Sequence, residues 1–99
     1  MLNYDAVRQR DFGRIVHTYA QRDTMLYALG TGLGFDPMDE NQLRYVYEKN
    51  LAALPTMAIV LATPGPWHRT GNTGIDGTKV VHGEQGLRIH KLLPVEGTI

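Results

Sequence analysis

The alternation of apolar and polar residues predicts the elements in the first half of the chain. Residues 12–20 are rich in β-branched and aromatic side chains, which favours a first strand. Residues 22–30 carry apolar side chains at helical spacing, with Asp23 or Thr24 able to cap the start and glycines after the last turn. They predict a short helix. Residues 43–48 alternate apolar and polar side chains and predict a second strand.

A buried helix and a long loop are predicted next. Pro55 suits the first turn of a helix, and the residues after it, up to position 62, are apolar in every direction, so a helix here must be surrounded on all sides. A buried strand is the alternative, which the proline and the alanines disfavour. Residues 63–77 are rich in glycine and proline and predict a long loop. Trp67 and His68 could anchor this loop or touch a ligand, and the pattern leaves both interpretations open.

The last part of the chain predicts further strands. Residues 79–94, KVVHGEQGLRIHKLLP, place Val81, Leu87 and Ile89 toward a core and charged or histidine side chains on the opposite face. Residues 97–99 begin another strand. Because a fully apolar helix lies among predicted strands, we expect an α+β domain whose sheet curls around the helix at 55–62.

Composition and charge restrict the classes of function. The chain has 99 residues, the size of one small domain, and a formal net charge of zero, so no long-range field attracts nucleic acid or anionic lipid. It has no cysteine, which excludes disulfides, thiolate metal sites and cysteine nucleophiles. No apolar run approaches the roughly 20 residues of a membrane span, and the N-terminus has no apolar signal core. We expect a cytoplasmic protein without nucleic-acid or membrane partners.

Few residues suggest chemistry by type and spacing alone. His82 is followed by Gly83, and a ligand can approach a strand backbone where no side chain blocks it, although a histidine on a strand is more often structural. Glu48 ends a predicted strand as either a solvated carboxylate or a hydrogen-bonding group at a tunnel mouth. The glycines at 30–34 lack phosphate-loop spacing and indicate a helix end. The histidines have no metal-ligand spacing, so we expect no metal.

Three blocks of the sequence resemble a known family. They are LYALGTGLG, LRYVYEKNLAALPTMAIVLA and VVHGEQGLRIHKLLPVEGTI, within Tyr19 to Ile99. In this order and at these distances they resemble the N-terminal half of the MaoC-like, type 2 enoyl-CoA hydratases. That family has two hot-dog halves in one polypeptide, each an antiparallel sheet around a central helix. It hydrates trans-2-enoyl-CoA to the (R)-3-hydroxyacyl-CoA and includes the hydratase part of peroxisomal multifunctional enzymes.

The resemblance implies roles for four residues. His82 and Gly83 match the positions that hold the acyl-CoA substrate, while Glu48 and Tyr27 match supporting positions. The family's catalytic motif, D-x-N-P-x-H, is absent, since no aspartate is followed five residues later by histidine. The chain is therefore expected to hold no catalytic residue and to need no cofactor beyond the acyl-CoA substrate.

The same resemblance implies partners for the chain. We expect residues 1–99 to be an N-terminal hot-dog domain truncated at its C-terminus, inactive alone and paired with a C-terminal catalytic hot-dog half in the same polypeptide or another chain. A homo-oligomer, in the simplest case a dimer, is also expected. The alternative is a non-catalytic acyl-CoA-binding or assembly module that pairs with a separate hot-dog subunit. A thioesterase is a third option, because hot-dog folds serve several acyl-CoA reactions.

Overall fold

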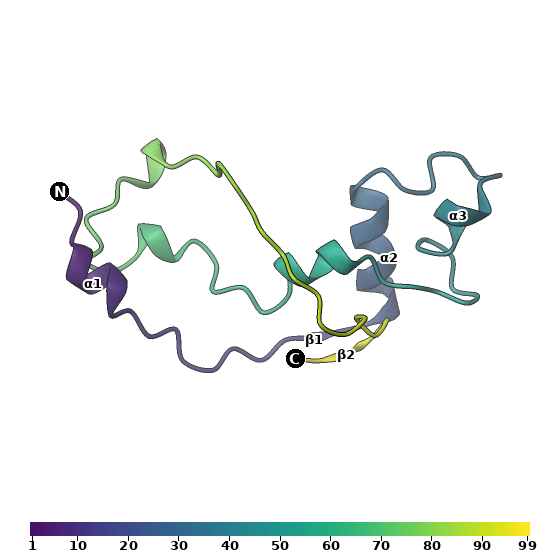
Figure 1. Cartoon of the computed structure of the whole chain (residues 1–99), viewed down its shortest axis with the longest axis horizontal. Helices are drawn as coiled ribbons and strands as arrows, with labels where there is room; N and C mark the ends of the chain where they lie inside the picture. Colours follow the sequence, from purple (N-terminus) through teal and green to yellow (C-terminus); the bar gives the residue numbers. More distant parts are fainter. The chain divides into compact units, whose positions relative to one another are not determined.

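Residues 1–99 are all described by the computed structural model, and the chain divides into two units (Figure 1). The loop unit comprises Met1–Ile15 and Thr63–Gly86. The core unit comprises Val16–Ala62 and Leu87–Ile99. Each unit combines segments that are distant in the sequence, so its internal contacts depend on tertiary structure.

The core unit contains the only paired strands. Its elements are β1 (Thr18–Tyr19), α2 (Gln21–Gly30), α3 (Glu40–Leu43), the 3₁₀ helix η1 (Pro55–Ile59) and β2 (Gly97–Thr98). β1 and β2 are antiparallel, with Thr18 opposite Thr98 and Tyr19 opposite Gly97. Backbone hydrogen bonds of 2.7 and 2.9 Å between His17 and Ile99 extend the pairing by one residue. The structure thus confirms the α+β class and a strand at the chain's last residues.

Helix α2 confirms the predicted helix at 22–30 and begins one residue earlier. The residue at the N-cap is Ala20, so the prediction that Asp23 or Thr24 is the cap was wrong. Asp23 still stabilises the helix start, because its carboxylate accepts a hydrogen bond of 2.8 Å from the Ala20 N–H. After the helix, Gly32 adopts a φ of 98°, a left-handed conformation that glycine takes at little cost and that stops the helix.

A small hydrophobic core lies between β1 and η1. Tyr19, Met57 and Leu61 are buried together, and partly buried apolar side chains pack against them: Tyr27, Ala53 and Leu93. The predicted helix at 55–62 is therefore helical, but it is a 3₁₀ helix that ends at Ile59. It is not surrounded on all sides, since Ile59 and Val60 are 37% and 48% exposed. The sheet is too short to curl around it.

Two of the predicted strands are absent and one is much shorter. Residues 43–48 form the end of α3 and the turns after it, because Asp39 caps this helix and the Tyr47 N–H donates to the Leu43 carbonyl at 2.9 Å. The alternating pattern is thus overridden by local hydrogen bonds. The predicted strand at 12–20 is reduced to β1.

Residues 79–94 contain no strand. Residues 80–88 are extended and exposed throughout, so their backbone groups are free to bond with water. A strand requires a neighbour with which to form a ladder of hydrogen bonds, and here no other segment supplies one. The periodicity of this segment is real, but the pairing that would make it a strand is missing.

The loop unit has short helices and almost no buried side chain. Its elements are α1 (Tyr4–Arg8) and the 3₁₀ helices η2 (Trp67–Arg69) and η3 (Gly77–Lys79). The predicted loop at 63–77 is confirmed, with one helical turn inside it. Thr73 is buried at 3% exposure and is tied in by two bonds: its carbonyl accepts from the Asn3 N–H at 2.8 Å, and its hydroxyl donates to the His68 carbonyl at 3.0 Å. No helix in either unit is both long and apolar enough to cross a membrane.

Candidate functional site

His82 and Gly83 lie in the extended, exposed part of the loop unit. A Cβ added to Gly83 would have no heavy atom within 4 Å, so the backbone at this position is open on the side where a side chain would stand. The structure therefore leaves the Gly83 peptide groups accessible to a ligand. The prediction that these two residues bind substrate stays a prediction.

Tyr27 and Glu48 both lie in the core unit, but they do not line a common hollow. Tyr27 is half-buried on α2, and its hydroxyl donates to the Thr56 Oγ1 at 3.0 Å. This bond fixes the phenol against η1, next to the hydrophobic core. Glu48 is exposed in the turns that follow α3. The supporting roles implied for both residues are likewise untested.

Two hollows of the core unit include residues that the sequence did not single out. One, of about 350 Å³, lies beside Glu48 and carries two cations; its lining residues are Glu40, Leu43, Arg44, Tyr47, Lys49 and Asn50. The other, of about 270 Å³, is mostly apolar and joins residues 44–55 to residues 92–95. The apolar hollow is formed entirely by segments of the blocks carrying the family resemblance, and the first hollow by one of these segments together with Glu40. Only the tertiary structure shows that residues 92–95 contribute to such a hollow.

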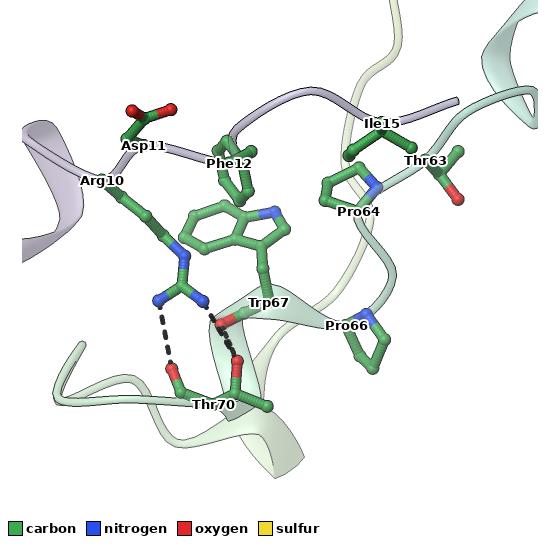
Figure 2. Close-up of a pocket in the computed structure, with 9 residues that line it drawn as sticks. All are labelled: Arg10, Asp11, Phe12, Ile15, Thr63, Pro64, Pro66, Trp67 and Thr70. Atoms are coloured by element: carbon green, nitrogen blue, oxygen red, sulfur yellow. Dashed lines mark hydrogen bonds between the residues drawn. The ribbon is translucent and has the colours of Figure 1, made fainter. Parts of the chain in front are cut away.

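A third hollow, of about 450 Å³ and larger than these two, lies in the loop unit (Figure 2). We name it the aromatic pocket; its lining residues are Arg10, Asp11, Phe12, Ile15, Thr63, Pro64, Pro66, Trp67 and Thr70. Sequence reasoning found only Trp67 among these residues, and only as one of two open interpretations. The signal that it missed is the pair of Arg10 and Phe12 at the start of the predicted strand at 12–20 and just before it.

Two side chains, Tyr19 and Asp76, have shifted pKa values, each because of its immediate surroundings. Burial raises the pKa of the Tyr19 hydroxyl, which donates to the Pro94 carbonyl at 2.7 Å. Hydrogen bonds from the Thr78 hydroxyl and then from the Thr78 N–H lower the pKa of the Asp76 carboxyl. No three histidine or carboxylate side chains are grouped so that they could hold a metal ion.

Comparison with known proteins assigns the chain to a protein family. A family model described as the MFE-2 hydratase 2 N-terminal domain matches residues 17–99. The chain is 31% identical over 90 residues to the peroxisomal enoyl-CoA hydratase 2 of Arabidopsis thaliana, an alignment that covers 84% of this chain and 29% of that protein. It is 35% identical over 91 residues to a probable enoyl-CoA hydratase 2 of Dictyostelium discoideum, with the same two coverages.

The match extends to a larger protein. The peroxisomal multifunctional enzyme type 2 of Mus musculus is 30% identical over 89 residues, which are 83% of this chain and 12% of that enzyme. Because the family match covers most of the chain, the chain belongs to the MFE-2 hydratase 2 N-terminal domain family. It spans less than a third of the length of the curated relatives that it matches. No solved structure matches the chain.

Proposed function

We propose that this chain is the N-terminal, substrate-binding half of an (R)-specific 2-enoyl-CoA hydratase. The observation that carries the proposal is the family match over residues 17–99, together with relatives named enoyl-CoA hydratase 2. In this proposal the complete domain has the hot-dog fold, and residues beyond this chain supply the strands that wrap the central helix. A C-terminal catalytic half adds water across the C2–C3 double bond.

His82 and Gly83 are proposed to contact the acyl-CoA. The open backbone at Gly83 supports this role, because a thioester or amide group of a substrate can hydrogen-bond to peptide groups that no side chain shields. Tyr27, held by Thr56, is proposed to keep the wall of the acyl tunnel rigid. The role proposed for Glu48 is to hydrogen-bond a side chain of the catalytic half.

The test measures hydration of a medium-chain trans-2-enoyl-CoA through the loss of its conjugated thioester absorbance. We expect turnover by the polypeptide that joins this chain to a C-terminal half bearing the D-x-N-P-x-H motif, and none by the 99-residue chain alone. Absence of turnover at every acyl-chain length tested contradicts the hydratase proposal. Turnover by the purified 99-residue chain contradicts the assignment of catalysis to the C-terminal half.

A variant pair tests the substrate-binding residues within the active polypeptide. We expect His82→Ala to raise KM by about tenfold, the effect of losing one hydrogen bond to substrate, with a smaller change in kcat. His90→Ala is the matched control, because His90 is also an exposed histidine of the same segment. Equal KM values for the two variants would remove His82 from the site.

A further inference from the structure

The aromatic pocket of the loop unit contains a cation without an anionic partner. The single ion pair in the chain joins Lys79 to Asp76, and no carboxylate comes within 4.0 Å of the Arg10 guanidinium. Asp11 lines the same pocket, but its carboxylate accepts from the Gly13 N–H at 2.7 Å and is turned away from Arg10 (Figure 2). A half-buried charge that lacks a partner gains from binding an anion.

The guanidinium is held in place by groups that leave its charge unneutralised. It donates to the carbonyl and to the hydroxyl of Thr70, at 3.3 and 3.2 Å. It also lies over two aromatic rings, 5.5 Å from the centroid of Phe12 and 5.9 Å from that of Trp67. These contacts fix the orientation of Arg10 before any ligand arrives. Because both Thr70 groups are neutral, its other N–H groups retain their charge-assisted donor strength.

The pocket also contains a group of apolar side chains, beside the polar Asp11, Thr63 and Thr70. Phe12 meets Trp67 edge to face with centroids 5.5 Å apart, and Figure 2 shows Ile15 and Pro64 beyond the indole. The hollow of about 450 Å³ falls within the usual range for small-ligand sites, roughly 300 to 1,000 Å³. An inorganic anion would use only Arg10, whereas a carboxylate with an apolar chain would also cover these apolar side chains. Each buried methylene adds roughly fourfold to affinity.

Only one wall of the pocket lies outside the residues that the family model matches. Arg10, Asp11, Phe12 and Ile15 all precede residue 17, where the family match begins. The matched residues 63–70 supply the opposite wall. The family relationship alone therefore assigns no role to this combination of side chains.

We propose that the aromatic pocket is a binding site for a small amphipathic carboxylic acid. The carboxylate pairs with Arg10, and a short aliphatic or aromatic body lies against Phe12 and Trp67, with Ile15 beyond them. This site acts through binding alone, and no covalent step is involved. It is independent of the hydratase proposal, because neither His82 nor Gly83 lines the pocket.

The single tryptophan makes the test direct, since every change in indole fluorescence of this chain comes from Trp67. Hexanoate is titrated into the whole 99-residue chain at constant ionic strength, with hexan-1-ol as the uncharged analogue and acetate as the short one. We expect a saturable change with a Kd on the order of 1 mM for hexanoate. Binding of hexan-1-ol and of acetate is expected to be at least about tenfold weaker.

Arg10→Gln is expected to weaken hexanoate binding at least about tenfold, because it removes the charge-assisted bonds. Arg14→Gln is the matched control, since Arg14 is exposed and does not line the pocket. No saturable change with hexanoate, equal binding of hexan-1-ol, or an equal loss in both variants overturns the proposal.

A second variant covers the case in which Arg10→Gln disrupts the loop unit. Ile15→Ser leaves the bonds between Arg10 and Thr70 in place and removes part of the apolar wall. It is expected to weaken hexanoate binding several-fold and to leave acetate binding unchanged. Slow amide exchange at Asn3, whose N–H donates to the Thr73 carbonyl at 2.8 Å, verifies that the unit is folded in each variant. Unchanged hexanoate binding in folded Ile15→Ser overturns the proposal.

Discussion

The core unit and the loop unit are stabilised by different interactions. In the core unit, Tyr19, Met57 and Leu61 are removed from water together, and the Thr24 and Tyr19 hydroxyls bind the carbonyls of residues 95 and 94. In the loop unit no apolar side chain is fully buried. It is held by hydrogen bonds around Thr73 and by the partly exposed contacts of Arg10 with two aromatic rings.

The difference indicates where the molecule is most easily opened. Apolar burial stabilises in proportion to the area removed from water, whereas a hydrogen bond accessible to solvent contributes little because water can replace it. Local opening should therefore be more frequent in the loop unit, which also contains the predicted substrate residues and the aromatic pocket. The predicted ligand contacts would then lie on the more mobile loop unit, while most of the stability of the chain comes from the core unit.

The largest effect is expected from the centre of the core. Met57 is 1% exposed, and Met57→Ala should lower the free energy of unfolding by about 2–5 kcal/mol through lost burial and the cavity left behind. Denaturant unfolding followed by circular dichroism measures the change. Met38→Ala is the control, because Met38 is 85% exposed and should change stability by no more than about 0.5 kcal/mol. Similar losses in both variants would show that the core unit has no packed centre.

A smaller effect is expected at the loop unit's tightest backbone contact. Gly74 has a φ of 69°, and a Cβ at this position would overlap the carbonyl oxygen of Met1. Gly74→Ala should cost about 1–3 kcal/mol and release the N-terminal segment, seen as faster amide exchange at Asn3. Gly86→Ala is the matched control in the same unit, since its Cβ would meet open space. If exchange within α2 accelerates as much as exchange at Asn3, the two units do not open independently.

Removing a hydrogen bond of the core unit should lower the free energy of unfolding less than removing the buried Met57 side chain does. The buried Thr24 hydroxyl donates to the Val95 carbonyl at 2.7 Å, and Thr24→Val removes the donor while keeping the shape of the side chain. The expected loss is about 1–2 kcal/mol, with faster amide exchange near Val95. Thr31→Val, at the opposite end of the same helix, removes a hydroxyl that donates to the Ala28 carbonyl at 2.8 Å, and because Thr31 is exposed the loss should be smaller, less than about 1 kcal/mol. A larger loss in Thr31→Val than in Thr24→Val would contradict the role of burial.

The smallest effect is expected at Asp76 in the loop unit. The Thr78 hydroxyl holds the pKa of the Asp76 carboxyl below its ordinary value, so Thr78→Val should raise that pKa. Since the folded pKa is lowered, the stabilisation is present above the ordinary value of about 3.9 and is lost as the pH falls through the folded pKa. Thr78→Val should therefore reduce stability at neutral pH, and only slightly, because Asp76 is exposed to solvent. Carboxyl chemical shifts measured during an acid titration test this. Thr63→Val, a control in the same unit, should leave the Asp76 titration unchanged.

Sequence reasoning predicted the site residues that are adjacent in the chain. His82 beside Gly83 was a prediction from residue types and resemblance, and the structure leaves it untested while showing an open backbone there. The aromatic pocket was not predicted, because Arg10 and Trp67 are separated by more than fifty residues and no local pattern links them. Pairwise spacing within a segment carries no information about such a contact.

The sequence by itself determined helix α2 and the family. Helix α2 follows from helical spacing, the carboxylate of Asp23 and the glycines after the last turn, all within a dozen residues of one another. Strands behave differently, because alternation specifies only which side chains share a face, and a strand exists only where another segment completes its hydrogen bonds. Tertiary structure decided that Thr18 pairs with Thr98 across eighty residues. It also decided that residues 80–88, with the same kind of pattern, stay unpaired.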